Sequence, residues 1–494
     1  MLIHTLSYSA FFLLRAYKLP SLNLRKIFTL SSIYGITPIL DKAVAMLLLP
    51  VLTHYLDRNQ YGSLVLLYAS AYLIQLFIFM GFPDTLAKVY WDYSEKKRQE
   101  CLGTAWTTTL LLNIALAIPL VFFSRRIAES VFSNRAVSIL IVLVLVKISL
   151  SAQSIIPMVA FRAREKKYHV LAVNLISTFC RLGLTLLFLI RFRMDLPGVF
   201  LAEIITNLIV LFIYIPCLAR EIRPRFSLHY LKHILSIAPY QFVVAVLAWV
   251  IHLSDRLFIQ HITHDIGEVG VYAVGYTFGS AILFLIQPLH TAWRPHVYAL
   301  NSQSPEEYTA QMGSFFAFFT VWCSASFLLI AALAPDFIRI LTPAPYHRAV
   351  SIVPVVLSAQ ILASLSNYFL PNFFIHKKVN VTAWIYMTAA IINAGINIYL
   401  IELIGIMGAA ISSLASYGIM FALILAYSQR LVRLKINSFA FLFLFFCIIL
   451  GYCISMLTFQ NILISLTVKT SLLAFIFGFI YKAFGAVRNL KKNV

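Results

Sequence analysis

Apolar runs of about 20 residues recur along the whole chain, and short polar stretches separate them. An α-helix rises about 1.5 Å per residue, so each run is long enough to cross a hydrocarbon layer about 30 Å thick. The pattern therefore predicts fourteen transmembrane helices. Their expected limits are residues 29–52, 61–82, 101–124, 136–161, 170–190, 198–219, 234–257, 269–293, 312–334, 349–370, 381–401, 405–427, 438–458 and 461–485.

Short motifs that recur at nearly one spacing indicate an internal repeat. The pairs are Asp57–Gly62 with Asp265–Gly270 at an offset of 208 residues, Lys166-Lys167 with Lys377-Lys378 at 211, and Pro197-Gly198 with Met407-Gly408 at 210. Each unit holds an even number of spans, so the second copy enters the membrane with the orientation of the first. The alternative is that glycine turns and basic loops recur by chance.

The repeat predicts the domain organisation of an all-α integral membrane protein. Two six-helix lobes, residues 29–219 and 234–427, are expected to be related by an axis along the membrane normal, and two further spans follow within residues 438–485. Residues 1–28 are expected to form an amphipathic segment at the membrane interface, unless the start codon is wrongly assigned. Residues 486–494 are expected to form a cytoplasmic tail.

Composition and charge placement agree with this interpretation. Hydrophobic residues make up 61% of the chain and charged residues 12%, a balance that a soluble fold could not bury. The net charge of +21 does not indicate nucleic-acid binding, because the Lys and Arg residues are spread over short loops. Loops and tails on the side of the N-terminus hold 26 of them, against 8 on the other side, which places both termini in the cytoplasm.

Cysteine and loop patterns exclude several other classes of protein. The six cysteines lie in or beside apolar runs without metal-ligand spacing, so no metal site is expected. The longest connection, around Trp91–Glu100, is too short to be a catalytic domain. Any chemistry must therefore take place in or beside the membrane.

Three regions of the sequence are similar to a known family. They are Leu47–Gly62, which reads LLLPVLTHYLDRNQYG, then Ser254–Ile259 with Glu268–Tyr272, and finally Gly405–Ile411. Over nearly its whole length the chain resembles bacterial polysaccharide transporters, the oligosaccharide flippases (O-antigen type included) of the multidrug/oligosaccharidyl-lipid/polysaccharide exporter superfamily.

The resemblance implies a transporter of the bacterial cytoplasmic (inner) membrane and not an enzyme. It implies that an undecaprenyl-pyrophosphate-linked oligosaccharide crosses the bilayer by alternating access between two lobes, without an ATPase or a cofactor. The sequence contains no Gly-x-x-x-x-Gly-Lys-Ser/Thr phosphate loop, which agrees with that expectation.

Four cations within or near the predicted spans are candidates for binding a pyrophosphate headgroup. An ionisable side chain near the bilayer centre costs about 2.5–3.5 kcal/mol on insertion scales, so it normally faces water or a partner. Guanidinium and ammonium groups are natural partners for a diphosphate. The candidates are Lys42, Lys147, Arg181 and Arg256.

Two carboxylates near these cations can be interpreted in two ways. Asp41 and Asp255 are candidates for coupling transport to a proton or Na⁺, because a carboxylate in a low-dielectric site binds a proton more readily unless a cation holds it ionised. Equally, each could pair with one of the four cations as a structural salt bridge. The sequence leaves both interpretations open.

Rival functions remain for a chain of this composition. A multidrug or small-cation antiporter of the same superfamily would favour acidic residues in its cavity, whereas cations outnumber acids at mid-span here. A membrane-embedded polysaccharide polymerase or ligase would be expected to carry a large outward loop with catalytic groups. A non-transporting scaffold is a third alternative. Expected partners are the lipid bilayer, the lipid-linked oligosaccharide and a polymerase or glycosyltransferase complex.

Overall fold

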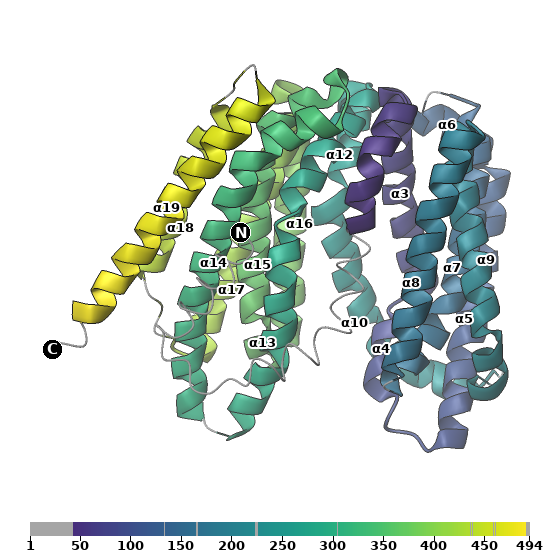
Figure 1. The fold of residues 1–494 in the computed structure, drawn as a ribbon. Helices are drawn as coiled ribbons and strands as arrows, with labels where there is room; N and C mark the ends of the chain where they lie inside the picture. The colour runs from purple at the N-terminus through teal and green to yellow at the C-terminus, as the bar shows by residue number, and fades with distance from the viewer. Residues whose placement is uncertain are drawn as a thin grey trace. The chain divides into compact units, whose positions relative to one another are not determined.

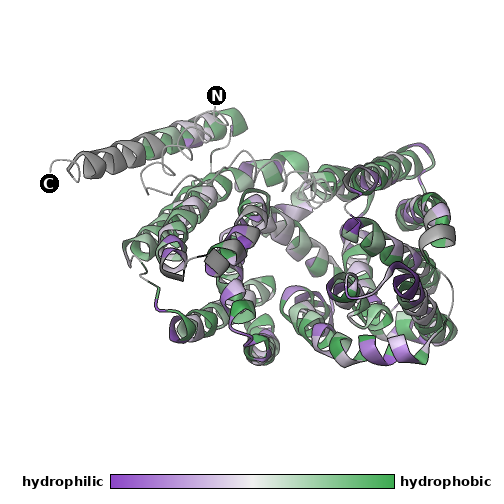
Figure 2. Cartoon of the chain, turned by 90° about the horizontal axis from the view of Figure 1, so that it is seen from below, coloured by the Kyte–Doolittle hydropathy of each residue, from purple (hydrophilic) through white to green (hydrophobic). Residues whose placement is uncertain are grey.

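Apart from short connections, the described part of the chain consists of helices, without a strand (Figure 1). The computed structural model describes residues 43–132, 134–164, 166–222, 226–303, 305–434, 436, 438–457, 459 and 461–490. Apolar positions make up much of the helices, as the green stretches of the ribbon show, and this is expected for helices that lipid surrounds (Figure 2). The chain is an all-α, multi-pass membrane protein, which confirms the predicted fold class.

The contacts between residues divide the chain into two compact units. We call residues 33–273 with 390–409 the N-terminal unit, and residues 274–389 with 410–494 the C-terminal unit. The predicted lobe limits, 29–219 and 234–427, stay a prediction, and residues 1–28 lie outside the described chain.

The helices follow the order of the predicted spans. The first half holds Ala43–Tyr55, α3 (Arg58–Phe79), α4 (Phe82–Val89), α5 (Glu95–Phe122), α6 (Ser124–Phe132), α7 (Val137–Ala163), α8 (Lys167–Leu186) with a π-helical turn (Leu187–Arg191), α9 (Asp195–Glu221), α10 (Leu228–Leu253) and α11 (Asp255–Thr263). The second half holds α12 (Ile266–Ser280), α13 (Leu283–Gln303), α14 (Pro305–Leu341), a 3₁₀ helix (Ala344–Ile352), α15 (Val353–Ile375), α16 (Val379–Ile404), α17 (Ile406–Leu431), α18 (Ser438–Met456) and α19 (Ile462–Leu490).

The predicted number of fourteen spans is not confirmed. Among the described residues, eleven helices are long and apolar enough to cross a membrane, and a twelfth results if α12 and α13, bent by 48° at a short break, count as one span. The apolar helices Ala43–Tyr55 and Ile462–Ile476 are shorter than a full span. The first predicted span begins in residues that lie outside the described chain.

In the N-terminal unit, the two Asp…Gly motifs lie against each other. Asp57 begins α3 with a capping box, in which its carboxylate accepts from the backbone of Gln60 at 2.8 Å. A Cβ added to Gly62 would lie 1.9 Å from the backbone oxygen of Ile266, so only glycine lets α3 and α12 approach this closely. Salt bridges from Arg58 to Asp265 and Glu268 close the same crossing.

In the C-terminal unit, α14 packs against α13, α15, α18 and α19. Its core is aromatic: the Trp293 and Phe315 rings stack at 3.9 Å between centroids, and Tyr368 lies parallel to Trp293 at 5.9 Å. The Tyr368 hydroxyl donates to the backbone oxygen of Met312 at 2.7 Å. The hydroxyl of this buried tyrosine is thus satisfied inside the bundle, as a membrane interior favours.

Candidate functional site

Side chains of three helices of the N-terminal unit converge on Glu203. Lys147 lies near the middle of α7, and its Nζ is 3.4 Å from Glu203 Oε2 on α9. The Tyr68 hydroxyl on α3 donates to Glu203 Oε1 at 3.1 Å. Lys147 Nζ also lies 5.0 Å from the centroid of the Tyr68 ring, within the range of a cation–π interaction. The three residues therefore interact as one group.

Arg181 adds a second cation to this group. It lies on α8, which packs against both α7 and α9, and it interacts electrostatically with Tyr68. We call Tyr68, Lys147, Arg181 and Glu203 the cationic cluster. Two of the four predicted headgroup candidates, Lys147 and Arg181, thus act on the same tyrosine.

The central ion pair of the cluster is only partly enclosed. The side chain of Lys147 is 18% exposed and that of Glu203 10% exposed, although both lie within membrane-spanning helices. Among the described residues, no donor makes a hydrogen bond to Glu203 Oε2. This oxygen is itself buried, and Lys147 Nζ at 3.4 Å is the cation beside it.

Arg256 and Asp255 form a second charged group, at the start of α11. Asp255 is fully buried, and the Tyr272 hydroxyl donates to its Oδ2. Arg256 Nη1 lies 3.7 Å from Asp255 Oδ1 and donates at 2.8 Å to the backbone oxygen of His252. Asp255 thus has a cation beside it on its own helix, as one of the two interpretations of the sequence requires.

The other two predicted residues are not placed. Lys42 and Asp41 lie outside the described chain, so the candidate headgroup cation and the candidate ion-coupling carboxylate of the first span stay predictions. In the part of the chain that the structure describes, no group of three or more His, Cys, Asp or Glu side chains could hold a metal ion.

Sequence reasoning missed a fully buried ion pair in the C-terminal unit. Lys469 Nζ on α19 lies 2.8 Å from Asp336 Oδ2 on α14, and Ser465 Oγ donates to Asp336 Oδ1 at 2.8 Å. Both charged side chains are 1% exposed. A lysine within an apolar run was the available signal, but its partner stands at the end of a distant span.

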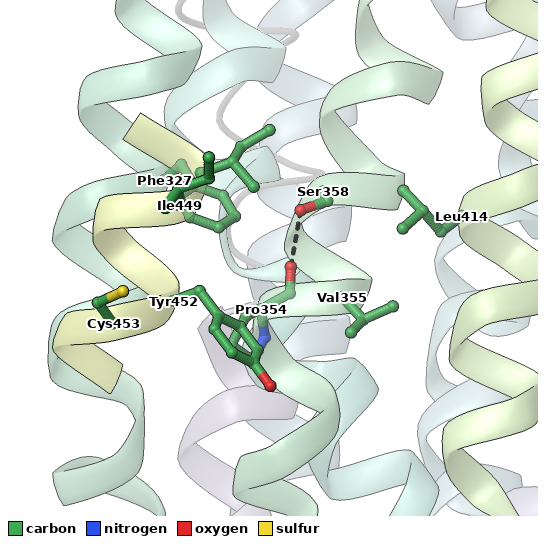
Figure 3. Close-up of a pocket in the computed structure, with 9 residues that line it drawn as sticks. Phe327, Pro354, Val355, Ser358, Leu414, Ile449, Tyr452 and Cys453 are labelled. Carbon is green, nitrogen blue, oxygen red and sulfur yellow. Dashed lines mark hydrogen bonds between the residues drawn. The ribbon is translucent and has the colours of Figure 1, made fainter. Parts of the chain in front are cut away.

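An apolar pocket of about 260 Å³ lies between helices of the C-terminal unit (Figure 3). Phe327, Pro354, Val355, Ser358, Leu414, Ile448, Ile449, Tyr452 and Cys453 line it. The Ser358 hydroxyl donates to the backbone oxygen of Pro354 at 2.9 Å, so its polar group is satisfied locally. The lining offers a cavity for hydrocarbon but no charged group for an anion.

Several transporters of known structure share the fold. The lipid II flippase MurJ in an inward closed conformation superposes with a TM-score of 0.70 at 13% sequence identity, covering 92% of this chain and 99% of the other. A MOP superfamily transporter from Pyrococcus furiosus gives 0.60 at 12% identity, with coverage of 82% and 96%. A MATE transporter in complex with MaD3S gives 0.60 at 12%, with coverage of 83% and 96%.

Sequence comparison identifies the family directly. No curated protein matches the chain. The profile of the family described as polysaccharide biosynthesis protein matches residues 24–299, which is more than half of the chain. The matched region contains the whole cationic cluster. This chain belongs to the polysaccharide biosynthesis protein family.

Proposed function

We propose that the chain is a flippase that carries a lipid-linked oligosaccharide with a diphosphate headgroup across the membrane, and that the cationic cluster binds the headgroup. The observation that carries this proposal is the placement of Lys147 and Arg181 within membrane-spanning helices around one tyrosine. A charge at that depth is costly unless a partner or a wet cavity compensates for it.

The chemistry of the cluster fits a diphosphate. An ammonium group and a guanidinium group both donate charge-assisted hydrogen bonds, and a diphosphate offers many acceptor oxygens. A cationic drug would have to approach two side chains of its own charge, Lys147 and Arg181. Lys42 and Arg256 are proposed as further headgroup contacts, and Asp41 and Asp255 as sites of ion coupling.

The comparisons support transport of this substrate class. The family description refers to polysaccharide biosynthesis, and a lipid II flippase shares the fold. The excess of basic residues on one side supports a bacterial inner membrane with both termini in the cytoplasm. A polymerase or glycosyltransferase complex is the proposed source and acceptor of the substrate.

Proteoliposomes test the proposal. The purified chain is reconstituted with a fluorescent isoprenoid diphosphate oligosaccharide, and a membrane-impermeant quencher reports the fraction that changes leaflet. We expect Lys147→Ala with Arg181→Ala to reduce the initial rate at least about tenfold, since each removes a charge-assisted contact. Arg191→Ala, at an exposed arginine that ends the π-helical turn after α8, is the matched control and should keep the rate.

The same vesicles separate the rival function. If the double alanine variant flips the lipid as fast as the unmodified chain, the cationic cluster is not the headgroup site. If the unmodified chain moves no lipid but exchanges a fluorescent cation, the chain is an exporter of small cations and the proposed function is wrong.

A further inference from the structure

Polar side chains of α3 and α7 meet at two successive levels within these membrane-spanning helices. At the first level, Lys147 Nζ lies 5.0 Å from the centroid of the Tyr68 ring. At the second level, Gln75 Nε2 donates to Ser151 Oγ at 3.0 Å. Gln75 follows Tyr68 by seven residues and Ser151 follows Lys147 by four, so each helix presents both of its polar residues on one face. Polar contacts thus continue from the cationic cluster along both helices.

Gln75 and Ser151 keep hydrogen-bonding capacity for a ligand. A glutamine amide offers two N–H donors and a carbonyl acceptor, and the contact with Ser151 uses one of the donors. Ser151 donates its own hydrogen to the backbone oxygen of Ile148 at 2.9 Å, and one lone pair of its oxygen remains. Both side chains are partly exposed. Polar groups within a span normally face the bundle interior or a wet cavity, so a ligand in such a cavity can reach them.

We propose that Gln75 and Ser151 form a subsite for the sugar bonded to the diphosphate, and that they bind its uncharged hydroxyl or amide groups. This inference rests on the proposed function, because it requires the cationic cluster to hold the diphosphate. At 1.5 Å per residue, Ser151 lies about 6 Å along α7 from Lys147, and Gln75 about 10 Å along α3 from Tyr68. The sugar follows the diphosphate directly, so a substrate with its phosphates at Lys147 can extend its sugar over this interval.

The chemistry of the subsite fits an uncharged sugar, since neither side chain carries a charge. The remaining N–H and the carbonyl oxygen of Gln75 can bind two polar groups of one sugar ring, donating to one and accepting from the other. Hydroxyl and N-acetyl groups both offer this combination. A ligand that ends at the diphosphate makes none of these hydrogen bonds, so it should bind less tightly.

Ligands with the same tail and diphosphate, with and without a sugar, test the proposal. Farnesyl diphosphate and its galactosyl and N-acetylglucosaminyl derivatives are titrated into the full-length purified chain, and the ratio of Kd values without and with the sugar is measured. We expect at least one sugar to tighten binding about tenfold, which corresponds to one or two net hydrogen bonds. Gln75→Leu should bring this ratio close to one and leave the Kd of farnesyl diphosphate unchanged.

Ser151 supplies a second variant with a matched control. Ser151→Ala removes one acceptor but keeps the amide of Gln75, so it should narrow the ratio less than Gln75→Leu does. Ser236→Ala is the control, because Ser236 on α10 is exposed and likewise donates to the backbone oxygen three residues before it, at 2.7 Å. If Gln75 and Ser151 only held α3 against α7, their variants would change all Kd values by one factor and keep the ratio.

The outcomes distinguish this inference from the proposed function. If the unmodified chain binds none of the ligands, or if Lys147→Ala with Arg181→Ala binds them as well as the unmodified chain does, both are overturned. If the double alanine variant loses the ligands but Gln75→Leu keeps the original ratio, only the sugar subsite is overturned. The same holds if neither sugar tightens binding to the unmodified chain.

Discussion

Removing Lys469 should destabilise the C-terminal unit strongly, because it leaves Asp336 buried without its cation. Lys469→Met keeps most of the side-chain volume, so the cavity it creates is small and the cost is mainly electrostatic. Breaking a buried pair by removing one partner typically costs about 3–5 kcal/mol. We expect a value near the lower end, about 3 kcal/mol, because Ser465 continues to donate to Asp336.

The double variant Lys469→Met with Asp336→Leu isolates the electrostatic contribution. Replacing both members of a buried pair by apolar side chains is often neutral or stabilising, so the double variant should recover most of the loss. A cost of 3 kcal/mol corresponds to a change of about 150-fold in the unfolding equilibrium constant, since about 1.4 kcal/mol is tenfold.

Reversible unfolding in mixed detergent micelles, followed by the fluorescence of the six tryptophans, measures these free energies. Val468→Met, on the adjacent and partly exposed position of α19, is the control for placing methionine in this helix. A loss below about 1 kcal/mol for Lys469→Met, or a double variant as unstable as the single one, would refute the reasoning.

Three further substitutions probe the packing of the helices. Gly62→Ala should destabilise the contact of α3 with α12, because the new Cβ would lie 1.9 Å from the Ile266 oxygen. A Cβ at Gly183 would meet no atom within 4 Å, so Gly183→Ala should be neutral or stabilising. Thermal unfolding compares the two variants. Asn372→Ala should cost about 1–3 kcal/mol in the same assay, because Asn372 accepts from Tyr308 and donates to Ser428 in a buried chain of hydrogen bonds. Trp249→Phe removes the indole hydrogen bond to the Ala69 oxygen and should lower the free energy of unfolding in micelles by about 1 kcal/mol. Trp384→Phe, at an exposed tryptophan, is the control and should leave that free energy unchanged.

The positions of the helices could be predicted from the sequence, but their ends and bends could not. The span expected at 101–124 begins at Glu95 in the structure, because a helix continues beyond the hydrocarbon layer as long as its backbone bonds are satisfied. The span expected at 269–293 is bent between α12 and α13. The pattern of apolar residues indicates which segments lie in lipid, but it says little about where a helix ends or bends.

The candidate site shows the same limit at the level of side chains. Lys147 and Arg181 could be selected because a cation within an apolar run is rare. Glu203 and Tyr68 could not be assigned to them, since which helices face each other depends on packing between distant segments. With 25 tyrosines in the chain, no local pattern distinguishes the one whose hydroxyl binds Glu203.

The contact between the two Asp…Gly motifs has a consequence for how the sequence can change over time. A Cβ on Gly62 would meet Ile266, and one on Gly270 would lie 2.9 Å from the Arg58 oxygen. Each motif therefore restricts the residues that its counterpart can accept. Mutations at one site should persist in descendants only when the opposite site changes with it, so these two stretches should evolve as a linked pair although 208 positions separate them.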